Sequence, residues 1–238
     1  MASAQVRFSA AHRREQILEV ATRLFARQGF QGTTTKQISQ HAKVNEALIF
    51  RHFPGKNELY WAVIERKIAS AAPRQHLREK LELEGDDLEV FTRLAAEILN
   101  RRAKDQTLSR LLLFTALENH GLSHRFFLTY VAGYYGLLAD FIRQRIEDGR
   151  FRPVDPLLAA RGFLGMVIYH SWVQELFGGK HYQKFDVQQV SRTLAEIWLQ
   201  GMLAKPGPDR CLSSAKPRNA NQRNQGKKQE NVARVDNH

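Results

Sequence analysis

Hydroxyl and cationic side chains are concentrated between residues 33 and 56, where they suit a polyanionic ligand. The segment Thr33-Thr34-Thr35-Lys36 precedes and opens a short predicted helix, and the hydroxyls and free backbone N–H groups of a helix N-terminus bind phosphate. Lys56 stands at the start of a later predicted helix, where its charge opposes the helix dipole unless an anion is bound. DNA phosphate is such an anion, which makes this segment a candidate DNA contact.

A second short helix, predicted over residues 45–52, completes a helix-turn-helix. A tight turn at Lys43-Val44 precedes it, Asn45 is a good N-cap, and Leu48 and Ile49 form its inward side. In such a unit the second helix enters the major groove, and polar residues near its start reach the bases. We therefore predict that the unit contacts DNA through Thr33, Thr34, Thr35, Lys36, Asn45, Glu46, Ala47, Phe50, Arg51, His52 and Lys56.

These residues also have plainer interpretations. The threonines can serve only as helix caps, His52 can be an ordinary surface histidine, and Arg51 can simply be solvated. Glu46 can accept a hydrogen bond from cytosine N4, or it can repel phosphate and so sharpen specificity. Both roles of Glu46 stay open at this point.

A longer helix over about residues 9–28 is predicted to brace the unit. Ser9 is a plausible N-cap, and Gly29 ends the helix. Between them, apolar residues recur at spacings of three and four and make one buried stripe, formed by Ile17, Val20, Ala21, Leu24 and Phe25.

The run from Arg13 to Tyr60, RREQILEVATRLFARQGFQGTTTKQISQHAKVNEALIFRHFPGKNELY, resembles the N-terminal domain of the TetR (tetracycline-repressor-like) family. An ordered set of pieces carries the resemblance: Ile17-Leu18, Ala21, Leu24-Phe25, Gly29-Phe30, Thr33-Thr34, Ile38, Ala42-Lys43-Val44, residues 48–53, Lys56 and Leu59. It implies a transcriptional regulator, commonly a repressor that a small molecule releases from DNA. It also implies a second, helical domain for effector binding and dimerisation.

Three positions depart from the usual pattern of that family. Phe50 stands where Tyr is usual, so the ring is kept but the hydroxyl that would bond a phosphate or base is lost. Asn45 replaces a common Ser cap, and this exchange should change the stability of the helix very little. Ala47 replaces a common Gly, and this exchange should stabilise the helix slightly.

Helical periodicity continues beyond residue 56, and no Val/Ile/Thr run alternates as a strand would, so we predict an all-α fold. Gly and Pro residues punctuate the expected helices. With the three helices above, about nine helices result, the later ones near 56–81, 87–103, 107–119, 123–148, 156–177 and 186–203.

Charge and composition divide the 238 residues into three parts. The formal net charge is +12, but residues 1–60 hold nine Lys or Arg against four acidic residues, and residues 205–238 hold eight against three. We predict a helix-turn-helix DNA-binding domain over 1–55, an effector-binding and dimerisation domain over 56–204, and a disordered basic tail over 205–238. The tail can aid solubility or add nonspecific phosphate contacts; binding to an anionic membrane is the weaker alternative, because the tail has no amphipathic face.

The helices near 156–177 and 186–203 are rich in apolar and small residues and are predicted to pair with their copies in a homodimer. A dimer reads two half-sites of a palindromic double-stranded operator, about 34–36 Å apart or a multiple of that. The alternative is that both are plain core helices of a monomer.

Aromatic residues mixed with a few polar ones in the second domain suggest a pocket for an unknown amphipathic or aromatic small molecule. Most aromatic residues on helices belong to the core instead. The candidate pocket residues are Trp61, Phe91, Phe114, Glu118, Phe127, Tyr130, Tyr134, Met166, His170 and Trp172.

Other classes of function have little support. No phosphate-binding loop, H-E-x-x-H or C-x-x-C motif is present, so we expect no catalytic residue, metal site or cofactor. The one cysteine, Cys211, excludes an intramolecular disulfide. The first residues lack the apolar segment of a signal peptide, and no apolar run is long enough to span a membrane. We therefore expect a cytoplasmic protein without a membrane partner.

Overall fold

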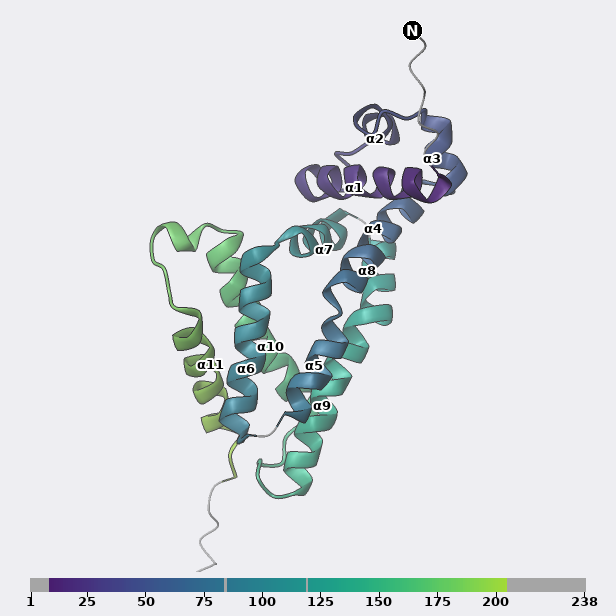
Figure 1. The fold of residues 1–238 in the computed structure, drawn as a ribbon. Helices are drawn as coiled ribbons and strands as arrows, with labels where there is room; N and C mark the ends of the chain where they lie inside the picture. Colours follow the sequence, from purple (N-terminus) through teal and green to yellow (C-terminus); the bar gives the residue numbers. More distant parts are fainter. Residues whose placement is uncertain (1–8, 84, 119, 205–238) are drawn as a thin grey trace, which may run out of the picture. The chain divides into compact units, whose positions relative to one another are not determined.

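The computed structural model describes residues 9–83, 85–118 and 120–204, and in these ranges the protein is all-α, as predicted (Figure 1). One isolated antiparallel bridge, between Phe151 and Leu203, is the only β pairing among the described residues. The tail predicted over 205–238 lies outside them. The helices are α1 (Ala10–Gln28), α2 (Thr35–His41), α3 (Glu46–His52), α4 (Lys56–Ala71), α5 (Pro73–Glu82), α6 (Asp87–Lys104), α7 (Thr107–Glu118), α8 (His120–Phe126), α9 (Ala132–Glu147), α10 (Pro156–Glu175) and α11 (Val187–Met202).

Side-chain caps fix the starts of the first three helices where the sequence predicts them. The Ser9 hydroxyl accepts from the N–H of His12, and the Asn45 side chain accepts from the N–H of Ala47. Thr34 forms a capping box with Gln37, in which each side chain accepts from the other residue's backbone N–H. Gly29 ends α1 with a φ of 78°, a left-handed value that favours glycine.

A first hydrophobic core joins α1, α2 and α3 to α4 as far as Ile68, and it includes Leu111 of α7 and Leu122 of α8. Tyr60 on α4 lies at its centre, with the rings of Phe25 and Phe30 packed edge-on at centroid distances of 4.7 and 5.3 Å. The buried Tyr60 hydroxyl donates to the carbonyl of Leu111 on α7 at 2.7 Å, and the Thr115 hydroxyl lies 3.0 Å from it. The first core therefore includes part of α4 and contacts α7, so it extends beyond residue 55.

The single helix predicted over 56–81 is interrupted. Ala72 adopts a left-handed conformation with a φ of 39°, and Pro73 then starts α5 at its first helical position. Proline lacks an N–H and its ring clashes with the preceding turn of a helix, so α4 cannot continue through it. The prediction of one uninterrupted helix is therefore wrong at this point.

The helix predicted over 123–148 starts earlier and changes its winding. It begins at His120 and passes through a π-helical segment, η1 (Phe127–Val131), before α9. A π-turn contains an extra residue and often marks a functional position in a helix. No sequence pattern indicated it.

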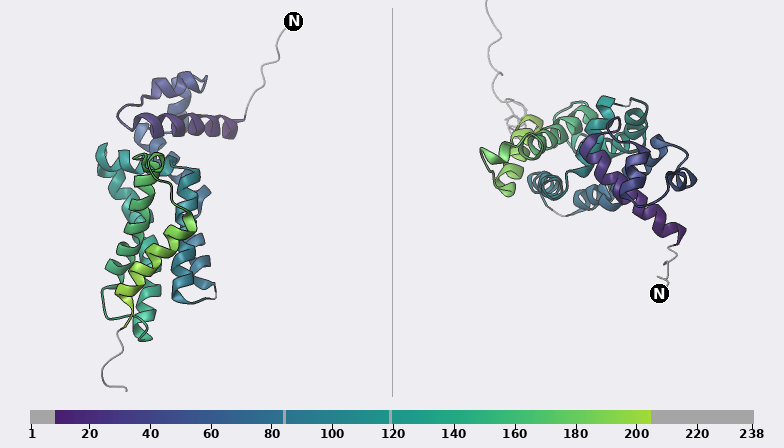
Figure 2. Two further views of the ribbon diagram at one scale, coloured as in Figure 1. Left: turned by 90° about the vertical axis from the view of Figure 1, so that its left-hand side faces the viewer. Right: turned by 90° about the horizontal axis from the view of Figure 1, so that it is seen from above.

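A second hydrophobic core is formed by α5, α6, α9, α10 and α11. Its centre is a group of aromatic rings around Phe91 on α6, which lies 4.8 Å from Phe163 and 4.4 Å from Trp198, measured between ring centroids. The helix α6 packs against both α10 and α11 (Figure 2). A short 3-10 helix, η2 (Gly179–His181), lies in the connection between α10 and α11.

The buried hydroxyl of Tyr60 should contribute to stability. We expect Tyr60→Phe to lower the free energy of unfolding by about 1 kcal/mol, because it removes one buried hydrogen-bond donor without changing the ring. Urea unfolding measures this change. The matched control is Tyr182→Phe at a side chain that is 94% exposed; equal effects of the two substitutions would contradict the role given to the Tyr60 hydroxyl.

Candidate nucleic-acid interface

One side of α3 is buried in the first core and the other side is free. Ile49 is 1% exposed, Leu48 is half-buried, and Phe53 closes the end of the helix in the core. Ala47 and Arg51 are exposed, and Phe50 is 49% exposed. The helix thus presents an outward face that begins at its capped N-terminus.

The turn between α2 and α3 is held from α1. Lys43 has a φ of 53°, and the N–H of Val44 donates to the carbonyl of Ser39 at 3.0 Å. The side chain of Gln16 on α1 donates to the carbonyl of Ala42 at 2.9 Å. The sequence reading missed Gln16, which is a long-range partner that only the fold brings to the turn.

A hydrogen bond joins the N-terminal ends of α2 and α3. The Thr35 hydroxyl donates to Oε1 of Glu46 at 2.6 Å. Glu46 is half-buried, and this hydrogen bond orients its carboxylate at the start of α3. This contact is compatible with either role considered for Glu46, acceptance from a base or repulsion of phosphate.

Thr33 does not lie on the outward face. Its side chain is fully buried, and its hydroxyl donates to the carbonyl of Gly29 at 2.9 Å. The structure thus contradicts a side-chain contact between Thr33 and DNA, because Thr33 closes the loop after α1. Thr34 and Lys36 are exposed, and Thr35 is half-buried.

Lys56 lies at the start of α4 with its ammonium group over the ring of Phe30, 4.3 Å from the centroid. Burial lowers the pKa of Lys56, and the nearby Glu118 carboxylate opposes this shift. The N-cap of α4 is Gly55, which provides no side-chain cap. The first N–H groups of α4 and the Lys56 side chain together form an arrangement suited to a phosphate.

The remaining predicted contacts are distributed around α3. His52 is half-buried, and its ring lies 6.3 Å from that of Phe53. Between residues 33 and 56 the sequence has one acidic residue, Glu46, against four Lys or Arg. The segment therefore combines a positive charge with an exposed helix face, as an element that enters a groove of DNA requires.

The ten candidate pocket residues lie in different surroundings. Phe91 is a buried core residue, Trp61 is buried against Tyr130, and Phe127 is largely exposed. Glu118 accepts from the N–H of Gln31 at 2.8 Å, next to the DNA-binding segment. A contact with an effector therefore stays a prediction for the ten candidates, which are Trp61, Phe91, Phe114, Glu118, Phe127, Tyr130, Tyr134, Met166, His170 and Trp172.

Burial affects a polar group in three of these residues. Burial raises the pKa of Tyr134 to about 12. The indole N–H of Trp172 is buried without a hydrogen-bond partner among the described residues. His170 lines a cavity of about 220 Å³ between α6, α10 and the segment that leads to α11, and burial lowers the pKa of its imidazole.

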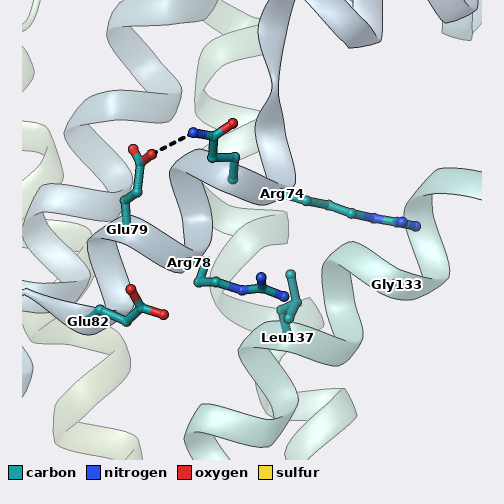
Figure 3. A pocket seen from close by; sticks show the side chains of 7 residues that line it. Arg74, Arg78, Glu79, Glu82, Gly133 and Leu137 are labelled. Atoms are coloured by element: carbon teal, nitrogen blue, oxygen red, sulfur yellow. Dashed lines mark hydrogen bonds between the residues drawn. The ribbon is translucent and has the colours of Figure 1, made fainter.

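A larger cavity, of about 630 Å³, lies between α5 and α9 (Figure 3). Residues that the sequence reading did not select line it, among them Arg74, Arg78 and Leu137. The spacing of Arg74 and Arg78 places both on one face of a helix, which was the available signal. The position of α9 opposite that face could not be read from local sequence.

Family comparisons agree with this arrangement of elements. The model of the tetR family of bacterial regulatory proteins matches residues 17–63, and that of the AefR-like transcriptional repressor C-terminal domain matches residues 87–200. The uncharacterized HTH-type transcriptional regulator YvkB of Bacillus subtilis is 34% identical over 193 residues, which cover 80% of this chain and 97% of YvkB. The chain belongs to the TetR family.

Two further comparisons extend the likeness over most of the chain. Nucleoid occlusion factor SlmA of Vibrio atlanticus is 29% identical over 160 residues, covering 66% of this chain and 81% of SlmA. The structure of the transcriptional regulator FadR of Bacillus subtilis in complex with stearoyl-CoA superposes with a TM-score of 0.61 at 19% identity. That superposition covers 79% of this chain and 98% of FadR and shows a shared fold.

Membership makes the protein a TetR-family transcriptional regulator. Members of this family bind DNA operators and small-molecule effectors, typically dimerise, and are generally not enzymes. Among the residues that the structure describes, His, Cys, Asp and Glu side chains form no group of three or more that could hold a metal ion. In the same ranges no helix has the length and apolarity that a membrane crossing requires.

The different burial of Thr33 and Thr35 can be tested with isosteric substitutions. We expect Thr33→Val to lower the free energy of unfolding by about 1 kcal/mol and to leave DNA binding unchanged, because its hydroxyl bonds only within the fold. Thr35→Val should weaken DNA binding several-fold, because it releases Glu46 and removes a surface hydroxyl. Urea unfolding measures the effect on stability, and titration of labelled DNA measures the effect on binding. Weaker DNA binding by Thr33→Val with unchanged binding by Thr35→Val would contradict the placement of Thr33.

Proposed function

We propose that the protein is a homodimeric repressor that binds a palindromic operator through α3 and is released by a small amphipathic or aromatic effector. It acts in the cytoplasm, where its DNA is accessible, and it has no catalytic activity of its own. The DNA-contacting residues are Thr34, Thr35, Lys36, Asn45, Glu46, Ala47, Phe50, Arg51, His52 and Lys56. Thr33 is left out because it is buried.

The outward face of α3 carries this proposal. Its first turn is capped by Asn45 and leaves Ala47 exposed, so the bases of a major groove can approach closely there. Glu46 is held beside it by Thr35. Lys56 and the N-terminus of α4 stand on the flank, where phosphate contacts fix the orientation without reading sequence.

A row of exposed apolar and small residues on α10 supports dimerisation. Leu158, Gly162, Gly165 and Tyr169 are exposed and follow one another at spacings of four and three, so they share one side of the helix. On the adjacent α11, Ile197 and Gly201 are exposed at a spacing of four. Apolar side chains beside glycines allow close helix packing, which suits a four-helix interface between two copies.

Buried polar groups support an effector site in the helical body. The Trp172 indole N–H and the Thr92 hydroxyl are buried and have no hydrogen-bond partner among the described residues. An unpaired buried donor costs free energy, and a ligand with an acceptor can recover it. FadR of Bacillus subtilis, which shares the fold, binds stearoyl-CoA, an amphipathic molecule.

Selection of bound sequences from a random DNA pool tests the DNA-binding proposal. We expect a palindromic site whose half-sites are about one helical turn apart. Lys56→Ala should weaken binding to all sequences alike and reduce the salt dependence, because it removes a phosphate contact. Glu46→Gln and Ala47→Ser should instead change the selected bases.

Glu19→Gln serves as the control for Glu46→Gln, because Glu19 is an exposed acidic residue on α1 that pairs with Arg23. It should leave both affinity and sequence preference unchanged. If Lys56→Ala altered the selected bases, or if Glu46→Gln and Ala47→Ser only weakened binding uniformly, the roles given to α3 and α4 would be wrong.

Charged substitutions on α10 and α11 test the dimer. Leu158→Asp and Ile197→Asp should convert a dimer to a monomer in sedimentation velocity, because a buried unpaired carboxylate is costly in an apolar interface. Leu83→Asp, at an exposed leucine after α5, is the matched control and should leave the dimer intact. A dimer that survives both interface substitutions would place the interface elsewhere.

A further inference from the structure

The cavity between α5 and α9 contains two arginines with different partners (Figure 3). Both project from α5 toward α9, Arg74 toward Gly133 and Arg78 toward Leu137. Neither arginine forms an ion pair among the described residues. A cavity of about 630 Å³ is large enough for a small organic molecule.

Arg74 connects α5 to the π-helical segment η1. Its Nη2 donates to the carbonyl of Thr129 at 2.7 Å and lies 3.3 Å from that of Tyr130. Gly133 makes room for this contact, because a Cβ there would lie 2.5 Å from the same nitrogen. The Arg74 side chain therefore holds α5 against the one π-turn among the described residues.

Arg78 is exposed and makes no hydrogen bond or ion pair within the described ranges. The nearby Glu79 is engaged by the side chain of Gln75 at 2.9 Å and lies 3.5 Å from the ring of His76. Glu82, also in the lining, is not within ion-pair distance of Arg78. A free guanidinium offers two parallel donors to a carboxylate or phosphate, and Leu137 beside it offers apolar contact.

The segment η1 also contacts the first half of α4. The ring of Tyr130 lies 5.9 Å from that of Trp61, measured between centroids. Just before η1, Arg125 lies 4.0 Å above the Trp61 ring and pairs with Glu58 at 3.2 Å. Because α4 follows α3 after three residues, a shift of η1 acts on the helix that carries Lys56 and adjoins α3.

We propose that the α5–α9 groove binds the carboxylate or phosphate group of an amphipathic effector through Arg78, and that the bound anion draws Arg74 away from the η1 carbonyls. Loss of the Arg74 contact loosens η1 against Trp61 and so alters the support of α4 and α3. This inference rests on the proposed function, because it names the chemistry of that effector's anionic group and places that group in the α5–α9 groove, whose lining does not include Trp172 or Thr92. It requires no catalytic step.

Titration of the full-length protein without DNA tests the site directly. The probes are octanoate, octyl phosphate and inorganic phosphate. Tryptophan fluorescence and calorimetry measure their binding. We expect saturable binding of at least one of the two amphipathic probes, tighter than that of inorganic phosphate, with a change in fluorescence because Trp61 contacts η1. Comparison of the affinities for octanoate and octyl phosphate shows whether Arg78 prefers a carboxylate or a phosphate.

Arg78→Gln should weaken binding of the amphipathic probe by about tenfold or more, because it removes a charge-assisted bidentate contact. Arg143→Gln is the matched control, since Arg143 is an exposed arginine on α9 that pairs with Asp140 outside the groove. It should bind the probe like the unaltered protein. Equal affinities of the Arg78→Gln and Arg143→Gln proteins, or no saturable binding of any probe at millimolar concentration, would overturn the proposal.

Arg74→Gln and Gly133→Ala test the second step, because the first removes the guanidinium and the second displaces it. Both should weaken binding to the selected DNA in the absence of any probe, while circular dichroism shows an intact fold. Unchanged DNA binding by both folded variants would overturn the link from Arg74 to α4. A compound could instead release the operator equally well from the unaltered protein and from the Arg74→Gln and Arg78→Gln variants. That result would refute the groove as the effector site and leave the repressor proposal standing.

Discussion

The orientation of α3 depends on the burial of one side of a seven-residue helix. A helix of this length is not stable by itself in water, because nucleation is costly and too few hydrogen bonds follow it. Ile49 and Phe53 anchor it in the first core, and Asn45 satisfies an N–H group at its start. Without these contacts the outward face that begins at Ala47 would have no fixed direction toward DNA.

The core that holds α3 is connected to the rest of the protein by polar contacts on its far side. Arg110 on α7 donates to the carbonyl of Ala26 at the end of α1, and Glu118 accepts from the N–H of Gln31. Tyr60 joins α4 to α7 through the Leu111 carbonyl. A displacement of α7 would therefore change the support of α1 and α4, and with it the support of the helices packed on them.

Features with a local cause were predictable from the sequence. The caps at Ser9, Thr34 and Asn45 follow from side chains that bond N–H groups two or three residues away. Pro73 was a local signal for the end of α4. The apolar periodicity on both sides of it nevertheless led to the prediction of one continuous helix over 56–81. The burial of Thr33 was not predictable from local sequence, because a threonine before a helix can either face solvent or close a loop.

Features that depend on packing between distant segments were not predictable. The η1 π-turn has no sequence pattern, and its carbonyls are bonded by Arg74 from a helix more than fifty residues earlier in the chain. The lining of the α5–α9 groove depends on the same packing, as does the position of Phe91 in the second core rather than in a pocket. Residue types alone suggested aromatic pocket walls, whereas the fold placed two arginines beside the cavity between α5 and α9.

The most direct measurement of the central claim is the structure of the protein bound to DNA obtained by selection. The account predicts two copies related by a two-fold axis, each with the N-terminal turn of α3 in a major groove. Glu46 and Ala47 should lie at base edges, and Lys56 should lie at a phosphate. A complex in which α3 does not enter the groove, or in which residues 205–238 alone contact the DNA, would contradict it.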